Sequence, residues 1–328
     1  MYQKVHSDPD IYSIFVPLPD NPLKNLNSYL IVTRDRNLLI DTGFQHPRCL
    51  YALLEGLREV GADLHHTDLF LTHMHSDHAG LASGLLPPGS RIYMGRTDYH
   101  RLLDCLSGQE WARSDASFLS HGFPAEFLQK LTAQNPARAM QPLAPFPAQL
   151  MDDGDVIQVG PYRFTCVLTP GHTPGHMCLY CPDRQLMLLG DHILFDISPN
   201  ITAWEGVEDS LGDYLASLRR VRSMEVRTAL PAHRKGSDQF IPRIDTLLEH
   251  HERRLAETLS AVTAHPHADA YHLAACLTWS MRGRCWDDFP ISQRWFATGE
   301  TVAHLDRLRV QGAVSRQLVQ GIWQYSLA

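Results

Sequence analysis

The chain has 328 residues, of which 44% are apolar and 20% charged, and its formal net charge is −7. This balance is typical of a globular protein with a buried core, and it argues against a nucleic-acid binder driven by bulk positive charge. Because the N-terminus is polar and no long apolar run occurs, we expect no signal peptide, no membrane span and no membrane partner. The seven cysteines are odd in number and scattered, which favours reduced thiols and a cytoplasmic location.

The first part of the chain predicts a layered α/β domain. Short β-like segments, one amphipathic helix and a strand that runs into His73 alternate along it. The expected strands cover residues 11–17, 28–33, 37–41, 68–72 and 91–94, and the expected helix covers 47–60.

Residues 96–150 break this rhythm and predict a helical insert. The segment is too long for a plain connection, and its last part is rich in proline. Its Trp111, Phe118, Phe123 and Phe127 need a surface on which to pack. We expect the insert to cover the functional edge of the domain and to line a substrate pocket, although these aromatics could instead form a small core within the insert.

The β-like pattern resumes after the insert. Strands are expected at 156–159, 162–168, 177–180, 185–189 and 228–230, and a helix at 209–221. Cys178 and Cys181 form a C-x-x-C within one of these strands, where their side chains point to opposite faces. We therefore interpret both cysteines as structural rather than as a redox or metal site.

The character of the chain changes at about residue 240. Helices are expected at 244–262 and 270–281, and a third begins near Ser292 or Thr301 and ends at Arg309. Gln320-Gly321 then separates two β-like runs, which is a hairpin signal. Three helices and a hairpin resemble a winged-helix domain, so we predict two domains, at 1–239 and 240–328, the second being winged-helix-like and α+β.

A histidine-rich motif follows the strand at 68–72. The segment His73–His78 reads H-x-H-x-D-H and supplies His73, His75, Asp77 and His78. Imidazole and carboxylate ligands in this combination suit zinc, iron or manganese. Three later residues are each the first metal-competent side chain after a β-like run, and since strand ends of one sheet system share an edge, we expect them to join the motif there. They are His172, Asp191 and His233.

These motifs resemble those of the metallo-β-lactamase superfamily, in the same order along residues 10–236. The resemblance rests on the H-x-H-x-D-H segment, on Gly171–His176, on Gly190-Asp191 and on the last histidine, with Leu39–Gly43 matching an early motif. It implies an αββα sandwich with the site along one edge. All seven ligand positions of the family are filled here.

The resemblance also implies a role for each residue. One metal takes His73, His75 and His172, the other takes Asp77, His78 and His233, and Asp191 bridges the two. The cofactors are two divalent ions, with zinc favoured over iron or manganese, and a hydroxide between them is the nucleophile. Asp191 and Asp77 are the candidate catalytic residues, Asp77 by assisting proton transfer to the leaving group.

Several residues near the motif have a less defined role. Asp41 either bonds the ligand loop or caps a turn, and we favour the first. His176 and His192 either support the ligands or only pack beside them. The remaining histidine pairs are expected on the surface, namely His65-His66, His250-His251 and His265 with His267.

Within the superfamily the motif resembles glyoxalase II, the acyl-homoserine lactonases and the lactamase-like endoribonucleases. We expect a metal-dependent hydrolase of a small thioester, ester or lactone. The alternative is a phosphodiesterase or endoribonuclease that binds nucleic acid through the winged helix. Residues 240–328 hold nine arginines and no lysine against nine acidic residues, so nucleic acid is the disfavoured partner. We interpret this region as a packing or dimerisation module, which leaves a homodimer open.

Overall fold

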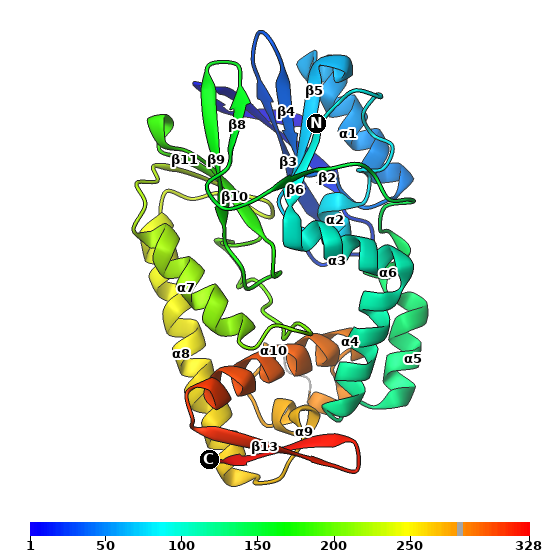
Figure 1. The fold of residues 1–328 in the computed structure, drawn as a ribbon, viewed down its shortest axis with the longest axis vertical. Helices are drawn as coiled ribbons and strands as arrows, with labels where there is room; N and C mark the ends of the chain where they lie inside the picture. The colour runs from blue at the N-terminus through cyan, green and yellow to red at the C-terminus, as the bar shows by residue number, and fades with distance from the viewer. Residues whose placement is uncertain (281–284) are drawn as a thin grey trace.

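Two mixed β-sheets stacked face to face form the main body of the computed structural model, which describes residues 1–280 and 285–328 (Figure 1). Helices cover the outer face of each sheet, and a helical C-terminal region that ends in a β-hairpin extends below them. The layers follow the order helix, sheet, sheet, helix, as the sequence predicts.

The first sheet holds seven strands in chain order. Strands β1 to β4 pair antiparallel, and strands β4 to β7 pair parallel. The parallel half therefore delivers several strand ends to one edge. The strands are β1 (Tyr2–Ser7), β2 (Asp10–Pro17), β3 (Asn25–Val32), β4 (Asn37–Ile40), β5 (Thr67–Leu71), β6 (Ile92–Gly95) and β7 (Gln149–Met151).

The second sheet holds five strands in the order β12-β11-β10-β9-β8. All neighbours pair antiparallel except β11 and β12, which run parallel. The ends of β11 and β12 thus lie at the same edge. The strands are β8 (Val156–Val159), β9 (Tyr162–Leu168), β10 (Met177–Cys181), β11 (Leu186–Gly190) and β12 (Thr228–Pro231).

Successive side chains of a strand point to opposite faces of its sheet, so they join different hydrophobic cores. In β5, Phe70 packs between the two sheets, whereas Leu69 and Leu71 join the core beneath helix α1 (Pro47–Val60). In β10, Cys181 lies between the sheets and Cys178 lies on the outer face, beneath α7 (Ser210–Arg222). The two side chains thus point to opposite faces of the strand, as predicted, and all seven cysteines are free thiols.

The insert is helical, as predicted. It joins β6 to β7 and comprises α3 (Arg96–Ser107), α4 (Gln109–Ser120), α5 (Ala125–Gln134) and α6 (Pro136–Ala139). Glycines with positive φ separate its first helices, since Gly108 (φ 83°) ends α3 and Gly122 (φ 85°) follows α4.

Two aromatic residues of the insert, Phe118 and Phe123, pack away from the sheet edge. Phe118 stacks on Trp295 with ring centroids 4.6 Å apart, and Phe123 meets Tyr271 edge-on at 5.5 Å. Both phenylalanines are buried in a core that the insert shares with the C-terminal helices. The pocket prediction is therefore wrong for these two side chains, because the C-terminal region offers them a closer apolar surface.

In the part of the chain that the structure describes, the C-terminal region consists of three main helices and a hairpin. Its elements are α8 (Phe240–Ala264), α9 (Ala270–Ala275), α10 (Ile291–Val310), β13 (Val314–Val319) and β14 (Ile322–Leu327). Helix α8 contributes Phe240, Ile244 and Leu247 to the same core as α7. The region is thus packed directly onto the second sheet, and the division at residue 239 stays a prediction.

Some elements differ from those predicted. Strands β1 and β7 were not foreseen, because one is exposed and the other has only three residues. Helix α9 ends at Ala275 and not at 281, since Cys276 already has the geometry of a helix cap, and Met281 lies outside the described residues. Single turns of 3₁₀ helix occupy Leu64–His66, Pro182–Arg184 and Trp286–Asp288.

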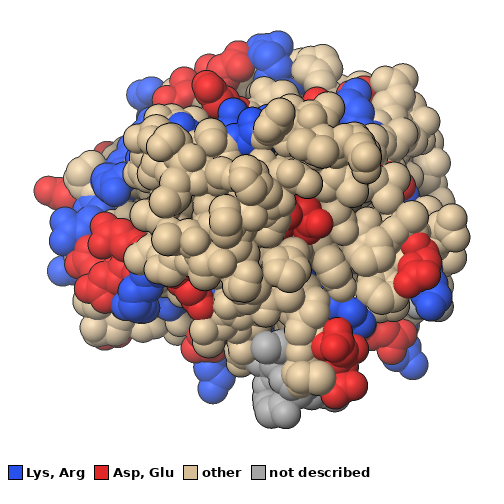
Figure 2. All heavy atoms as spheres, turned by 90° about the horizontal axis from the view of Figure 1, so that it is seen from below, with Lys and Arg blue, Asp and Glu red and all other residues tan. Residues whose placement is uncertain are grey.

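The C-terminal end presents mostly uncharged side chains in the middle of the face seen from below, with acidic and basic groups intermixed towards its rim (Figure 2). None of the helices within residues 1–280 and 285–328 combines the length and the apolar character that crossing a membrane requires.

Candidate metal centre

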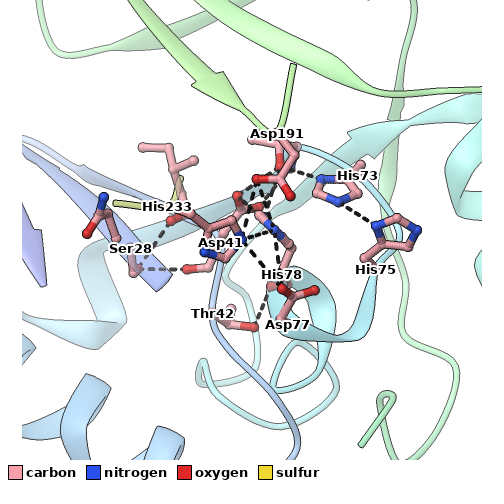
Figure 3. A network of polar contacts seen from close by, with 12 residues as sticks. Ser28, Asp41, Thr42, His73, His75, Asp77, His78, Asp191 and His233 are labelled. Atoms are coloured by element: carbon pink, nitrogen blue, oxygen red, sulfur yellow. Dashed lines mark hydrogen bonds and ion pairs between the residues drawn. The ribbon is translucent and has the colours of Figure 1, made fainter. Parts of the chain in front are cut away.

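The predicted ligands meet at one edge of the sandwich, where four strands end, and Figure 3 labels all of them except His172. The motif follows β5, with Asp77 and His78 in the short helix α2 (Ser76–Ala79). The other three residues come from the second sheet: His172 follows β9, Asp191 follows β11 and His233 follows β12. Side chains far apart in the sequence thereby lie in contact, as the sequence predicts.

Three histidines form the first group. Nε2 of His73 lies 3.1 Å from Nδ1 of His75, and Nε2 of His172 lies 3.0 Å from the same atom. The Nδ1 atom of His172 faces the carbonyl oxygen of Asn200 at 2.8 Å, so its proton is on Nδ1 and its Nε2 carries a lone pair. The three ring nitrogens lie within 4.8 Å of one another and can hold a metal ion.

Asp77, His78 and His233 form the second group. Nδ1 of His233 lies 2.9 Å from the carbonyl oxygen of Asn25, and Nδ1 of His78 lies 2.8 Å from Asp41 Oδ2. Both protons therefore point away from the site, and the two Nε2 lone pairs face each other at 3.3 Å. Two acceptors at this separation call for a cation or a proton between them.

Asp191 lies between the two groups. Its Oδ1 is 3.4 Å from Nε2 of His233 and 3.6 Å from Nε2 of His78, and its Oδ2 is 3.7 Å from Nε2 of His172. Oδ1 is buried and accepts no hydrogen bond from the described residues. A buried carboxylate without a donor is costly, and a metal ion would satisfy it.

The electrostatics of the two groups differ. Burial lowers the pKa of His75 to about 3 and keeps the pKa of His73 far below its ordinary value, so both rings are neutral and could serve as ligands. Burial would also lower the pKa of His78, but the carboxylates of Asp41, Asp191 and Asp77 raise it well above 6.5. Burial raises the pKa of Asp77, yet His78 and His233 outweigh it and bring the value to about 2. The first group therefore offers neutral imidazoles, and the second group holds ionised carboxylates around its histidines, and together these donors suit divalent cations.

Asp41 supports the ligand loop, as we favoured from the sequence. It lies just after β4 with φ 59° and points beneath β5. Its carboxylate accepts bonds from the backbone N–H of Thr72 (2.9 Å), from the hydroxyl of Thr72 (2.8 Å) and from Nδ1 of His78. The Thr72 hydroxyl in turn accepts from His73 Nδ1 at 3.0 Å, so one carboxylate orients two ligand rings.

Asp98 is a supporting residue that the sequence analysis missed. From the first turn of α3 its carboxylate accepts bonds from the backbone of Met74 (3.0 Å) and Gly175 (2.6 Å) and from the hydroxyl of Thr173 (2.6 Å). It is fully buried, and burial raises its pKa to about 6 against these three bonds. Asp98 thereby ties the loop of His73 and His75 to the loop of His172.

Two further supports hold the remaining ligands. The Asn27 amide donates to the carbonyl oxygens of Pro231 (3.1 Å) and Arg234 (2.8 Å), on either side of His233.

Nε2 of His176 accepts the backbone N–H of Asp191 at 3.1 Å, which gives this histidine a supporting role. His192 only packs, since neither ring nitrogen has a partner among the described residues.

Trp204 forms a wall of the site. Its indole stacks beside the ring of His75 with centroids 6.1 Å apart, and its N–H donates to the carbonyl oxygen of His172 at 3.1 Å. The Arg101 guanidinium from α3 lies 5.6 Å from the indole. The insert therefore reaches the site through Asp98 and Arg101 and not through Phe118 and Phe123.

One expectation about the other histidines is wrong. His251 is buried and not on the surface; its Nδ1 lies 3.2 Å from Nε2 of His304. Both rings lie in the packed interface between α8 and α10. The sequence did not indicate the burial of His251, because its neighbours along the helix are polar. His65, His66, His265 and His267 are exposed, as predicted.

Two family models match the chain. The model of the metallo-beta-lactamase superfamily matches residues 22–233, and that of a metallo-beta-lactamase-like C-terminal domain matches residues 284–328. The second match covers the end of the region for which we predicted a winged helix, and a winged helix itself is not shown.

Two solved structures resemble the whole chain. A metallo-beta-lactamase family protein from Thermus thermophilus is 29% identical with a TM-score of 0.79, covering 97% of this chain and 98% of that one. A beta-lactamase domain protein from Burkholderia ambifaria is 26% identical with a TM-score of 0.82, covering 100% of this chain and 94% of that one. The sandwich and the C-terminal region thus occur together in these proteins.

Curated relatives match over a smaller share. The lactamase-like protein adaB of Aspergillus niger is 25% identical over 73% of this chain and 59% of its own length. An atrochrysone carboxyl ACP thioesterase of Emericella nidulans is 27% identical over 66% of this chain and 53% of its own length. The chain spans somewhat more than half the length of these relatives.

Proposed function

The chain belongs to the metallo-beta-lactamase superfamily, and from this premise we propose that it is a binuclear metal-dependent hydrolase whose substrate is a small acyl thioester. Esters and lactones share the carbonyl chemistry and are the next candidates. The proposal also includes zinc as the resident metal, because histidine and carboxylate ligands at a buried site suit it.

One observation carries the proposal. The lone pairs of His73 and His172 converge on one point, those of His78 and His233 on another, and the ionised Asp191 lies between them. We assign His73, His75 and His172 to one ion and Asp77, His78 and His233 to the other. The two oxygens of Asp191 face different groups, which supports a bridging role.

Two divalent ions, when bound, lower the pKa of water towards about 7 and polarise a substrate carbonyl. The chain itself contributes the positioning. Asp41 and Asp98 fix the ligand loops, and Trp204 limits access to the ion held by His75. Asp77 is 13% exposed and lies at the mouth of the second group, which suits transfer of a proton to the leaving group.

The preference for a thioester draws on the curated relatives. Two of them are described as atrochrysone carboxyl ACP thioesterases, at 25% and 27% identity. A thiolate is also a good leaving group that needs little protonation, which suits a site with one partly exposed carboxylate.

The C-terminal region gives little support to the alternative, a nuclease. Most of the arginines that the structure describes there are engaged within the protein, for example Arg254 with Glu257 and Trp279, and Arg307 with Asp209 at 2.7 Å. The face seen in Figure 2 mixes both signs of charge at its rim. Binding of a phosphate backbone needs a basic stripe, and the described residues of this face form none. We propose a packing role for the region.

The test is a substrate panel on protein of measured metal content. Acyl N-acetylcysteamine thioesters, a lactone, a β-lactam and bis-p-nitrophenyl phosphate are compared by kcat/KM. We expect the thioesters to be hydrolysed fastest, His172→Ala to lose metal and activity together, and His65→Ala, an exposed control, to keep both. Faster cleavage of the phosphodiester than of any thioester would overturn the substrate class.

A further inference from the structure

We propose a third metal site at the surface of the C-terminal region, formed by His265, His272 and Cys276 and taking a soft or borderline ion such as Zn²⁺ or Cu⁺. It is separate from the catalytic edge and does not depend on the proposed hydrolase activity. Its role is to join the end of α8 to α9.

The backbone brings the three side chains together. His265 is the residue that ends α8, and His272 and Cys276 are four residues apart on α9 and its C-terminal cap, so both project from one side of that helix. The His265 and His272 rings meet edge to face with centroids 5.3 Å apart. One ligand atom from each of the three residues lies within 4.8 Å of the others.

The separations are close to those that a metal ion needs. Zinc–nitrogen bonds of about 2.0 Å and zinc–sulfur bonds of about 2.3 Å place tetrahedral ligands roughly 3.3–3.6 Å apart. All three side chains are exposed, so small rotations about their own bonds close the remaining distance without moving the backbone. The exposure leaves the fourth position to water.

The chemistry of the set points to a metal rather than to a chance surface cluster. Two imidazoles and a thiol are soft to borderline donors, which select zinc or copper over calcium or magnesium. The Cys276 thiol makes only a weak contact, 3.4 Å from the carbonyl oxygen of His272, and a thiolate–metal bond would replace it. The nearby His267 is already engaged with the Ser326 hydroxyl at 3.1 Å, which makes it a control and not a ligand.

The local structure gives the site a function. Helix α9 is short and is held at its start by Asp269, whose carboxylate accepts the backbone N–H of His272 at 2.8 Å. The chain between α8 and α9 turns through His267, which has φ 65°. A metal that binds both helices restrains this turn, and binding to the folded state alone raises its stability.

The sulfur ligand allows this site to be distinguished from the catalytic edge by spectroscopy. The catalytic residues offer only nitrogen and oxygen, so a sulfur-to-cobalt charge-transfer absorption reports a cysteine ligand outside the catalytic edge. The intact chain is first loaded with two equivalents of Zn²⁺ and then titrated with Co²⁺. We expect the absorption to reach a plateau at one further equivalent.

Matched variants define the outcome. Cys276→Ser should abolish the absorption and His265→Ala should weaken Co²⁺ binding at least about tenfold, a loss of about 1.4 kcal/mol. Cys285→Ser, which removes the other exposed cysteine, and His267→Ala should leave both unchanged.

Zn²⁺ beyond two equivalents should also raise the Tm of the natural chain and not that of Cys276→Ser. An absorption that survives Cys276→Ser, or one that appears only at a large excess of Co²⁺ (an adventitious ion only), would overturn the proposal.

Discussion

His78 donates a hydrogen bond to Asp41, with Nδ1 of the ring 2.8 Å from Oδ2 of the carboxylate and both side chains buried. This contact fixes the ring so that its Nε2 faces the metal centre. The same carboxylate also bonds Thr72, so it sets the position of the loop as well as the tautomer of the ligand.

Asp41→Ala should therefore weaken metal binding without abolishing it. Loss of a partner that orients a ligand typically costs about 10–100-fold in metal affinity. Asp191→Ala should cost more, because it removes a direct contact to both ions. The check is the metal retained against a series of chelators, with kcat at equal metal content. If Asp41→Ala proved the more damaging at equal loading, the bridging role of Asp191 would be wrong.

Asp98 should be essential for the stability of the ligand loops. Asp98→Ala removes a buried charged acceptor of three hydrogen bonds, each worth about 1.5–3 kcal/mol, so we expect the free energy of unfolding to fall by at least about 3 kcal/mol. Asp104→Ala, which breaks the exposed ion pair between Asp104 of the same helix and Arg113 of α4, should cost less than about 1 kcal/mol. Equal losses in urea denaturation would contradict the role of Asp98 as a tie between loops.

Trp204 positions two ligands at once. Trp204→Phe keeps an aromatic ring beside His75 but removes the N–H that bonds the His172 carbonyl, whereas Trp204→Ala removes both contacts. We expect the alanine variant to raise KM for an acyl thioester more than it lowers kcat, with the phenylalanine variant intermediate. Trp323→Ala, on the hairpin, is the control. If the kinetics of Trp204→Ala matched those of the control, Trp204 would not be part of the wall of the substrate site.

Glu300 makes stability depend on pH independently of the metal centre. Its side chain is only 15% exposed, and burial raises its pKa to about 7 from 4.5, against the attraction of Arg254 3.5 Å away. The folded state thus binds this proton more tightly than the unfolded state. The stability it gives is complete below pH 4.5 and is lost as the pH rises through about 7.

Glu300→Gln removes this titration. Its free energy of unfolding, relative to the natural chain, should increase between pH 5 and pH 8 by up to about 3 kcal/mol, since each pKa unit corresponds to about 1.4 kcal/mol. Metal-dependent effects cancel in this difference. Glu252→Gln, an exposed change on α8, should follow the natural chain. Parallel profiles for Glu300→Gln and the natural chain would show that the carboxyl is ionised at all these pH values.

The sequence predicted most of the strands and the convergence of the candidate ligands because both have strong local signals. Apolar runs end in His172, Asp191 and His233, and a strand end is the place where such residues can converge. Asp98 carries no such signal: it is one aspartate in the first turn of a helix, and only the fold brings it to Met74 and Gly175.

The sequence predicted that the aromatic residues of the insert are packed, but it did not predict which part of the chain they pack against. The aromatics of α4 and α5 do need an apolar surface, as the composition indicates. That surface belongs to residues 271–295, far along the chain, and nothing in the local pattern of either segment identifies the other. Trp204 carries no local signal either, because its contact with His75 exists only once distant chain segments have folded together.

The most direct test of the central claim is zinc-dependent thioester hydrolysis by metal-free protein. We predict that hydrolysis of an acyl N-acetylcysteamine thioester is absent without metal, rises as Zn²⁺ is added, and reaches its maximum when both ions of the centre are bound. The Asp191→Ala variant and a His73→Ala, His75→Ala double variant should not reach this rate at any Zn²⁺ concentration. Full activity without metal, or stoichiometric zinc and full activity in the double variant, would contradict a binuclear centre built from these residues.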